Sequence, residues 1–529
     1  MTKNKIDIEF LLGTLSKPAA DIPKKERKTA LTIATALIEL KDHLSESLKS
    51  ALESALQELG GHPDAYNGMF IESLLFSLTA DIVHLNNITP YLSQYESDFF
   101  EASGTLMAVR SLLFEAHPLQ NATLKRVFDR DFCRKLFDIQ LAHIQRVYDE
   151  VAQKKRVGFS RNNVVAVLTP HFVGPPHAPS VDTLRFSKTL MTEFGKTVVI
   201  IVTSLCSYDV DGAIVPGVKP RRNDDLIGAD SVLYDGLSIP FLFCGDGVLS
   251  DVAVRQCLMA IDNLSPEMIL CVGEPAAMAE PFHERSFSFI YPLGHGLPLV
   301  KKNYFHVYSD PSVEETLIME REGISERCLF TQQYDLAVKP PSSSLTREQF
   351  LIPEDSFVFS VVGMRLHIDV DETLLDMFEK IAVNDRAHFL FVGNFSGYTE
   401  KLETRKSLRG RTTFIGFQDD IMAVHSITDV CINPSRSGGG TGVVYALQAE
   451  LPVLSLSTGD GGLVTSAFPE VRDYDHMSEI AAEMIESPAL LDTYRSICRR
   501  EAPKFSGQLI ARIITEFEKF AETRVVLPD

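Results

Sequence analysis

The chain is short of positive charge and lacks the marks of a membrane or exported protein. Its 529 residues include 51 Lys and Arg against 71 Asp and Glu, a formal net charge of −20. Nucleic-acid binding needs clustered Lys and Arg, so no nucleic-acid partner is expected. No apolar run is long enough to span a bilayer, and the start, MTKNKIDIEF, has no signal-peptide core. We therefore expect a soluble, cytoplasmic protein.

Metal-binding patterns are also missing. The eight cysteines are scattered without a C-x-x-C pair, which argues against zinc or a redox dithiol and favours reduced, buried thiols. Two Asp-x-Asp patterns occur. The one at 209–211 adjoins Gly212 and is typical of a turn, whereas the one at 369–371 leads into a predicted helix and fits carboxylates at its start. The sequence thus predicts neither a metal nor a cofactor.

Residues 1–158 are predicted to form an all-helical N-terminal domain. Apolar residues recur at spacings of three and four from 31 to 59, where Gly60 and Gly61 end the pattern, and similar patterns cover 71–85, 99–116 and 124–152. No catalytic cluster is visible in this region. This domain is therefore predicted to pack against the rest of the chain or to recruit partners. It could also form a homo- or hetero-oligomer.

Residues 159–340 predict a first doubly wound α/β domain. Val164–Leu168 is a continuous apolar run, as in a buried parallel strand. The loop TPHFVGPPHAP follows, then a helix for which Ser180 is the expected N-cap. Further strands are predicted at 197–202, 239–243, 268–272, 287–291, 305–308 and 328–331.

A Pro/Ser linker, KPPSSS, precedes a second α/β series at 341–529 that ends in an amphipathic helix over 507–523. Its predicted strands are 357–362, 389–392, 412–415, 430–432 and 452–456. Two such domains in tandem are expected to form a cleft between the carboxyl ends of their strands, where ligands bind in α/β sheets.

The chain is organised around a glycine cluster in this second series. A strand at 430–432 runs into Gly438, Gly439, Gly440, Thr441 and Gly442, and a helix pattern follows. This order places backbone N–H groups at a helix N-terminus, where the helix dipole favours an anion such as phosphate. The alternative is a tight turn of an ordinary α/β unit.

The motifs of the second series resemble a known family. The order VVGMRL, FVGN, FIGF, TDVCINPS, glycine loop and ALQAELPVLSLSTGDGG resembles the donor half of GT-B glycosyltransferases, with a family 4 layout, and GPPHAPSVDTLRFSKTL resembles the acceptor half. Arg365 matches the basic residue after the glycine turn. The Glu-x7-Glu pair of family 4 retaining enzymes is absent, since Ser437 and Tyr445 stand there, and the usual nearby lysine has no counterpart.

A second resemblance accommodates these departures. The O-linked N-acetylglucosamine transferases and the bacterial adhesin N-glycosyltransferases also have a helical domain before GT-B halves, a Leu-Gly-His turn, here 293–295, and an Asn-Pro…Gly-x-Thr-x-Gly loop, here 433–442. The resemblance implies a GT-B fold: two Rossmann-like domains facing a cleft, preceded by an all-α domain. It implies transfer of a hexose-type sugar from a nucleotide sugar, UDP-sugar favoured, to a protein side chain without a metal.

The resemblance also assigns roles to residues. The N–H groups of Gly439–Gly442 and the Thr441 hydroxyl would hold the diphosphate, and Arg365 would supply fixed positive charge. His295 would bond a phosphate or sugar oxygen. By position alone, Gly416 and Phe417 lie where the base is recognised.

On the acceptor side, His177 is the favoured catalytic group, with His171 and Asp182 as competitors. Two other functions stay open at this point. The chain could be a GT-B enzyme of another reaction, such as a sugar-nucleotide epimerase or a transferase acting on a glycan or small molecule. It could also be a non-catalytic partner or chaperone of another transferase, since the Glu pair and the lysine are missing.

Overall fold

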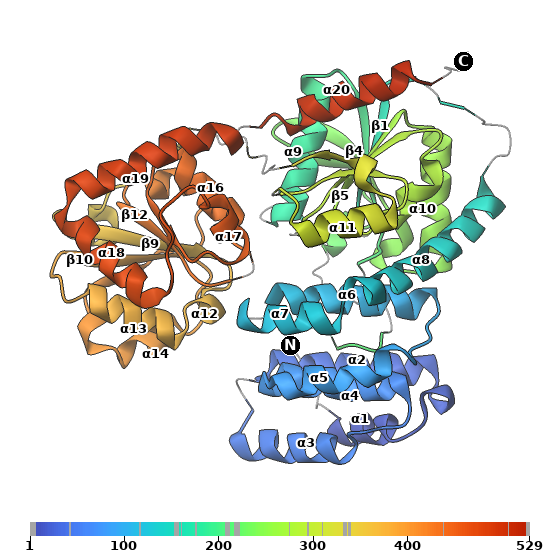
Figure 1. Cartoon of the computed structure of the whole chain (residues 1–529), viewed down its shortest axis with the longest axis horizontal. Helices are drawn as coiled ribbons and strands as arrows, with labels where there is room; N and C mark the ends of the chain where they lie inside the picture. Colours follow the sequence, from blue (N-terminus) through green and yellow to red (C-terminus); the bar gives the residue numbers. More distant parts are fainter. Residues whose placement is uncertain are drawn as a thin grey trace. The chain divides into compact units, whose positions relative to one another are not determined.

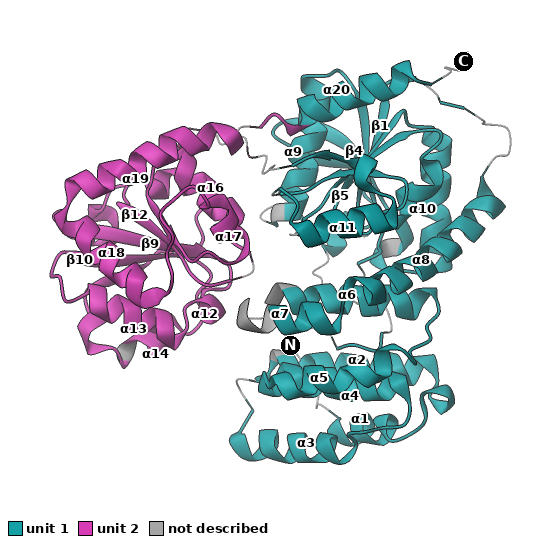
Figure 2. Cartoon of the chain, viewed as in Figure 1, with its two compact units in different colours: residues 1–115, 119–331, 510–529 teal, residues 116–118, 332–509 magenta. Residues whose placement is uncertain are grey.

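A computed structural model describes most of the chain. The described ranges are 7–41, 44–115, 118–152, 158–159, 161–174, 177–206, 212–215, 223–273, 276–293, 296–308, 310–331, 336, 340–436, 438–505 and 507–524. The chain divides into two compact units (Figure 2), unit 1 with residues 1–115, 119–331 and 510–529, and unit 2 with residues 116–118 and 332–509.

Unit 1 begins with helices, as predicted (Figure 1). They are α1 (Ile8–Leu15), α2 (Lys24–Glu39), α3 (Glu46–Glu58), α4 (Ala65–Thr79), α5 (Ile82–Leu92), α6 (Phe99–Glu115), α7 (Pro118–Val127) and α8 (Arg130–Val151). Three of the predicted helical stretches are each divided into two helices by a polar N-cap residue. The side-chain oxygen of this residue accepts a hydrogen bond from a backbone N–H in the first turn of the following helix. The capping residues are Ser45 before α3, Asp81 before α5 and Asp129 before α8.

The α/β part of unit 1 is a sheet of eight strands among the described residues, in the order β3-β4-β2-β1-β5-β6-β7-β8. The strands are β1 (Val164–Thr169), β2 (Thr197–Val202), β3 (Ser231–Tyr234), β4 (Leu237–Phe243), β5 (Met268–Val272), β6 (Phe287–Tyr291), β7 (Tyr304–His306) and β8 (Cys328–Phe330). All neighbours pair in parallel except β3 with β4, a hairpin that apolar runs alone did not predict. Helices α9 (Ala178–Thr192), α10 (Asp251–Leu264) and α11 (Val313–Glu322) connect the strands.

The N-termini of two helices in unit 1 are capped differently. Ser312 and Glu315 form a capping box at the start of α11, and Gly323 ends that helix in the left-handed conformation. Ser180 is wrong as the cap of α9, because that helix starts earlier, with His177 as its N-cap residue. The Ser180 hydroxyl instead lies inside the helix and accepts a hydrogen bond from the Val173 N–H at 3.0 Å.

The described residues of unit 2 form a sheet of five parallel strands in the order β11-β10-β9-β12-β13. They are β9 (Phe357–Gly363), β10 (Ala387–Gly393), β11 (Thr412–Phe414), β12 (Val430–Asn433) and β13 (Val453–Ser455). The helices are α12 (Leu366–Asp369), α13 (Glu372–Ile381), α14 (Tyr398–Glu403), α15 (Ile421–His425), α16 (Gly440–Gln448), α17 (Gly459–Val464), α18 (Tyr474–Glu486) and α19 (Pro488–Glu501). The predicted fold class is confirmed in that two α/β sheets, parallel except for the β3–β4 pair, follow a helical region.

The final helix, α20 (Leu509–Glu522), groups with unit 1, although the sequence placed it with the second α/β series. The cause is aromatic packing. Phe517 is fully buried, with ring centroids 6.2 Å from Phe159 and 6.1 Å from Phe287. Phe520 adds an edge contact to Phe159 at 5.6 Å. The predicted boundary at 341–529 therefore differs from the observed division at this helix.

Candidate functional site

The carboxyl ends of the unit 2 strands meet at one edge of the sheet. From β9 the chain adds β10 and β11 on one side and then returns to place β12 on the other side. The direction of winding therefore reverses between β9 and β12, and ligands of open α/β sheets bind at this switch point. The predicted glycine cluster follows β12 directly.

Arg436 fills the switch point, and the sequence reasoning missed it. Its guanidinium donates to the Val362 carbonyl at the end of β9 (3.0 Å), to the Asn433 side chain at the end of β12 (2.7 and 3.1 Å) and to Asp369 of α12 (3.0 Å). Only 9% of its side chain is exposed. The arginine therefore holds the two strand ends together beneath the glycine cluster.

The glycines around Arg436 are needed because of close packing. Gly439 has φ of 97°, and a Cβ atom there would lie 2.4 Å from Arg436 Nε and 2.7 Å from Asn433 Oδ1. A Cβ on Gly461 would lie 2.1 Å from Asn433 Nδ2. Gly442 differs, since none of the described atoms lies within 4 Å of such a Cβ. Gly439 and Gly461 thus allow close packing around Arg436 and Asn433, whereas Gly442 borders open space.

Helix α16 starts at the glycine cluster, as predicted. Its N-cap is Gly439, and no described side chain caps it. The Val443 N–H bonds back to the Gly439 carbonyl at 3.2 Å, so the N–H groups of Gly440, Thr441 and Gly442 precede the first intrahelical bond. Gly438 comes just before the cap. The arrangement has the geometry of an anion site at a helix N-terminus.

Arg365 lies after the end of β9 and begins α12 as its N-cap residue. Its guanidinium is 3.6 Å from Asp369 Oδ1, while the other oxygen of Asp369 accepts from Arg436. The two oxygens of one carboxylate therefore face two guanidinium groups. Asp371, the second member of the Asp-x-Asp pattern, caps α13 as predicted by accepting from the Leu374 N–H at 2.8 Å.

The loop between β12 and the glycines is fixed from helix α18. The Ser435 N–H donates to the Tyr474 hydroxyl oxygen at 2.8 Å. Burial raises the pKa of Tyr474 to about 12, so the phenol stays protonated and neutral at physiological pH. This bond holds the residue that precedes Arg436.

Gly416 and Phe417 follow β11 at the same edge of the sheet. Gly416 has φ of 69°, and its carbonyl accepts from the Gly393 N–H at 2.8 Å. The Phe417 ring is exposed to 46%. An exposed aromatic ring beside a strand end offers a stacking surface, and the base-recognition role stays a prediction.

The acceptor-side candidates lie in unit 1, beyond the end of β1. His177 Nδ1 is 3.0 Å from the Ser180 hydroxyl, and its Nε2 is 3.4 Å from His171 Nε2. The Ser180 oxygen can accept both from the Val173 N–H and from a proton on His177 Nδ1, and in that tautomer Nε2 is the ring nitrogen of His177 without a proton. Both ring nitrogens are thus engaged. His177 must leave His171 before it can accept a proton from a substrate.

The remaining acceptor-side candidates differ in their surroundings. Burial lowers the pKa of His171 to about 4, so this imidazole is neutral, and no described group bonds its Nδ1. Asp182 pairs with Arg185 at 3.1 Å. His295 lies outside the described residues.

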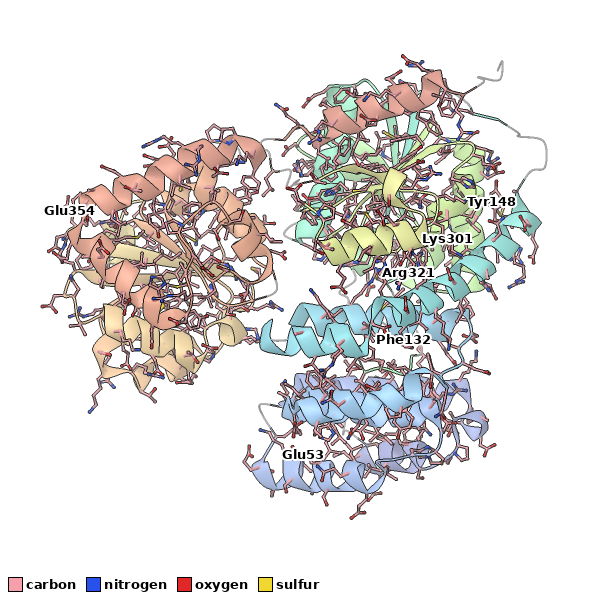
Figure 3. The ribbon with its side chains drawn as sticks, viewed as in Figure 1. Glu53, Phe132, Tyr148, Lys301, Arg321 and Glu354 are labelled. Carbon is pink, nitrogen blue, oxygen red and sulfur yellow. The ribbon has the colours of Figure 1, made fainter. Side chains whose placement is uncertain are left out.

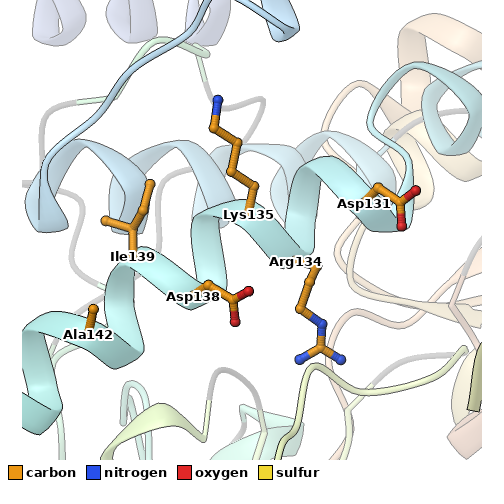
Figure 4. A pocket seen from close by; sticks show the side chains of 6 residues that line it. All are labelled: Asp131, Arg134, Lys135, Asp138, Ile139 and Ala142. Atoms are coloured by element: carbon orange, nitrogen blue, oxygen red, sulfur yellow. The ribbon is translucent and has the colours of Figure 1, made fainter. Parts of the chain in front are cut away.

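Unit 1 also has a hollow of about 590 Å³ along α8 (Figure 4), lined by Asp131, Arg134, Lys135, Asp138, Ile139 and Ala142. Its charges serve packing, since Arg134 bonds Glu322 and Lys301 reaches Asp138 at 2.9 Å. Figure 3 shows the side chains of the same region, including Lys301 and Tyr148, whose ring packs on Phe282. We assign the hollow no chemical role.

Within the described ranges, no three His, Cys, Asp or Glu side chains are grouped so that they could hold a metal ion. The same residues contain no helix with the length and apolar character needed to cross a membrane. Five cysteines, Cys244, Cys257, Cys271, Cys431 and Cys498, are buried free thiols, in agreement with the sequence interpretation.

A parallel sheet with a glycine turn and a helix N-terminus at its switch point defines a nucleotide-binding type of α/β unit. Comparison with known proteins shows which nucleotide-binding proteins this unit resembles. Residues 358–485, from β9 through most of α18, match the family model described as "Glycosyl transferases group 1". The matched stretch is the larger part of unit 2 but less than half of the whole chain, and the two α/β sheets after a helical region are typical of the GT-B fold.

The solved structures to which the chain is similar include an O-GlcNAc transferase mutant and HepE. An O-GlcNAc transferase mutant of Thermobaculum terrenum is 13% identical, with 98% of each chain covered and a TM-score of 0.43. HepE of Anabaena, solved in complex with UDP, is 14% identical, with 68% of this chain and 98% of that chain covered and a TM-score of 0.47. No curated protein sequence matches the chain.

Proposed function

We propose that this protein is a metal-independent glycosyltransferase that moves a hexose-type sugar from a nucleotide sugar, with UDP-sugar favoured, to a protein side chain. The observation that carries the proposal is the uncapped N-terminus of α16 at the switch point of a sheet that matches the group 1 glycosyltransferases. The UDP-sugar and the protein acceptor rest on the resemblance to the O-linked N-acetylglucosamine and adhesin transferases.

Transfer requires that the leaving diphosphate be stabilised as negative charge develops on it. In the proposal, the N–H groups of Gly440, Thr441 and Gly442 and the Thr441 hydroxyl bind its oxygens. Arg365 adds a fixed positive charge next to Asp369 and Arg436. These donors are fixed before the substrate arrives, so little reorganisation is needed during the reaction.

The acceptor group is activated in unit 1. There we propose that His177 acts after rotating away from His171, because only then is its Nε2 open to a hydroxyl or amide proton. The pKa of about 4 at His171 keeps that residue from competing as a base.

A second candidate is a non-catalytic partner of another transferase. It is favoured by Tyr445, which stands where family 4 retaining enzymes carry a glutamate and packs against the hydrophobic core of unit 2. Replacement of Thr441 or Arg365 by alanine distinguishes the two functions. An enzyme should lose most of its turnover, whereas a non-catalytic partner should still bind its transferase.

The test is calorimetric titration with UDP, GDP and their sugar conjugates, with and without EDTA. We expect metal-independent binding of one nucleotide, weakened at least about tenfold in Arg365→Ala because a charge-assisted contact is lost. The control is Arg499→Ala, which removes an exposed arginine of α19 paired with Glu450. Absence of binding by every nucleotide would refute the donor site and favour the partner function.

A further inference from the structure

A short segment of the α/β part of unit 1 is buried in the helical region. Residues 212–215, here named the strap, belong to the connection from β2 to β3. Ala213, Ile214 and Val215 are at most 1% exposed. An apolar segment so fully covered is part of the core of the helices that surround it.

Specific polar contacts seat the strap. The Ala213 N–H donates to the Thr105 hydroxyl of α6 at 3.1 Å, and the Val215 N–H donates to the Ser73 hydroxyl of α4 at 3.0 Å. Tyr95 also bonds the Thr105 hydroxyl, at 2.9 Å. Each buried N–H thus has its acceptor on a different helix, and this fixes the register of the strap.

The backbone of the strap also packs closely against the backbone of α6. A Cβ atom on Gly212 would lie 2.8 Å from the carbonyl carbon of Gly104 and 2.8 Å from the Thr105 nitrogen. Two glycines therefore allow the strap and α6 to touch main chain to main chain. A side chain at position 212 would push them apart.

The connection that carries the strap leaves and returns at the segment that holds His171. On departure, the Cys206 N–H donates to the Pro170 carbonyl at 3.3 Å. On return, the Asn223 side-chain amide donates to the Val173 carbonyl at 3.4 Å. The segment 170–174 is thus bonded to Cys206 and Asn223, and the strap, which the helical region holds, lies between these two residues in the sequence.

We propose that the helical region positions the acceptor-side segment 170–174, and through it His171 and His177, by means of the strap. Ser73 and Thr105 are then positioning residues, not catalytic ones. The assignment of an acceptor function to this segment rests on the proposed glycosyltransferase activity, whereas the mechanical link does not. It gives the helical region a role in the active site of its own chain, beyond partner recruitment.

The test is hydrogen exchange of the full-length protein, followed by mass spectrometry on peptides covering 170–174. Ser73→Ala leaves the buried Val215 N–H without its acceptor, so we expect exchange at 170–174 to accelerate by roughly tenfold. Ser77→Ala is the matched control. It lies one turn further on the same helix, and its buried hydroxyl bonds no described group.

A second pair keeps the test decisive if Ser73→Ala folds poorly. Thr105→Val removes the acceptor of the Ala213 N–H at nearly constant volume, and Thr105→Ser restores it, so only the valine variant should loosen 170–174. If exchange rises in α4 and the strap but stays unchanged at 170–174, the proposal is wrong. It is equally wrong if Ser77→Ala or Thr105→Ser has the same effect.

A kinetic measurement separates this link from the proposed function. With a mixed pool of Ser, Thr and Asn peptides as acceptor, Ser73→Ala should raise KM for the pool by roughly tenfold and leave UDP-glucose hydrolysis unchanged. A wild-type protein that transfers to no peptide would contradict the proposed acceptor, while coupled exchange would still support the link.

Discussion

The two glycines Gly439 and Gly442 should respond in opposite ways to alanine. Gly439→Ala places a side chain at φ of 97°, which costs about 1–2 kcal/mol in the left-handed region. The new Cβ would also lie 2.4 Å from Arg436 Nε. The guanidinium must therefore move from Asn433, with a loss of about 1 kcal/mol for each of two hydrogen bonds.

The sum for Gly439→Ala is a loss of roughly 3–4 kcal/mol in the free energy of unfolding of unit 2. Gly442→Ala should do the reverse. Gly442 lies in helix α16, and no described atom lies within 4 Å of a Cβ built on it. Alanine should therefore raise the free energy of unfolding by about 0.5–1 kcal/mol through its higher helix propensity. If the helix N-terminus holds the diphosphate, the same methyl group stands in the path of the ligand.

The assay is urea unfolding for stability and calorimetry for UDP binding, on the full chain. We expect Gly442→Ala to be as stable as wild type or more so, with UDP affinity reduced at least about tenfold. A stable Gly442→Ala variant that binds UDP as tightly as wild type would falsify the diphosphate assignment. A Gly439→Ala variant of unchanged stability would refute the packing argument around Arg436.

Three further outcomes are expected. Burial lowers the pKa of His425 to about 4, below the ordinary value of about 6.5. As the pH falls, the unfolded chain therefore binds a proton at this histidine before the folded chain does. The free energy of unfolding keeps its full contribution from His425 above pH 6.5 and loses about 2 kcal/mol of it by pH 5. His425→Phe should lessen this loss, as urea midpoints at the two pH values will show. Tyr474→Phe removes the acceptor of the Ser435 N–H and should cost about 1 kcal/mol by the same assay; no change would mean that the bond is dispensable. Phe517→Ala should destabilise unit 1 by about 3–5 kcal/mol and leave UDP binding by unit 2 intact, and reduced UDP binding would argue against the division into units.

The sequence predicted the strands of both sheets well because buried parallel strands are continuous apolar runs. Thr197–Val202 and Met268–Val272 are found at their expected bounds. The turn from β12 into α16 was also predictable, since three consecutive glycines before a helix pattern have few other uses.

What the sequence did not reveal depends on distant contacts. Arg436 was missed because a charged residue in a loop is normally solvated, and only the fold brings Asp369 and the Val362 carbonyl to it. Its place two residues after Pro434, within Asn-Pro-Ser-Arg, was the only local signal. The membership of α20 in unit 1 was equally hidden, because an amphipathic pattern shows that a face is buried but not against what.

The return of α20 has a consequence for synthesis of the protein. Unit 2 is encoded between two parts of unit 1, so ribosomes complete residues 332–509 before the helix that covers Phe159 and Phe287 exists. Unit 2 can therefore fold first, while an aromatic surface of unit 1 stays open to chaperones or to aggregation. The docking of α20 is then expected to be the last step in maturation of the nascent chain.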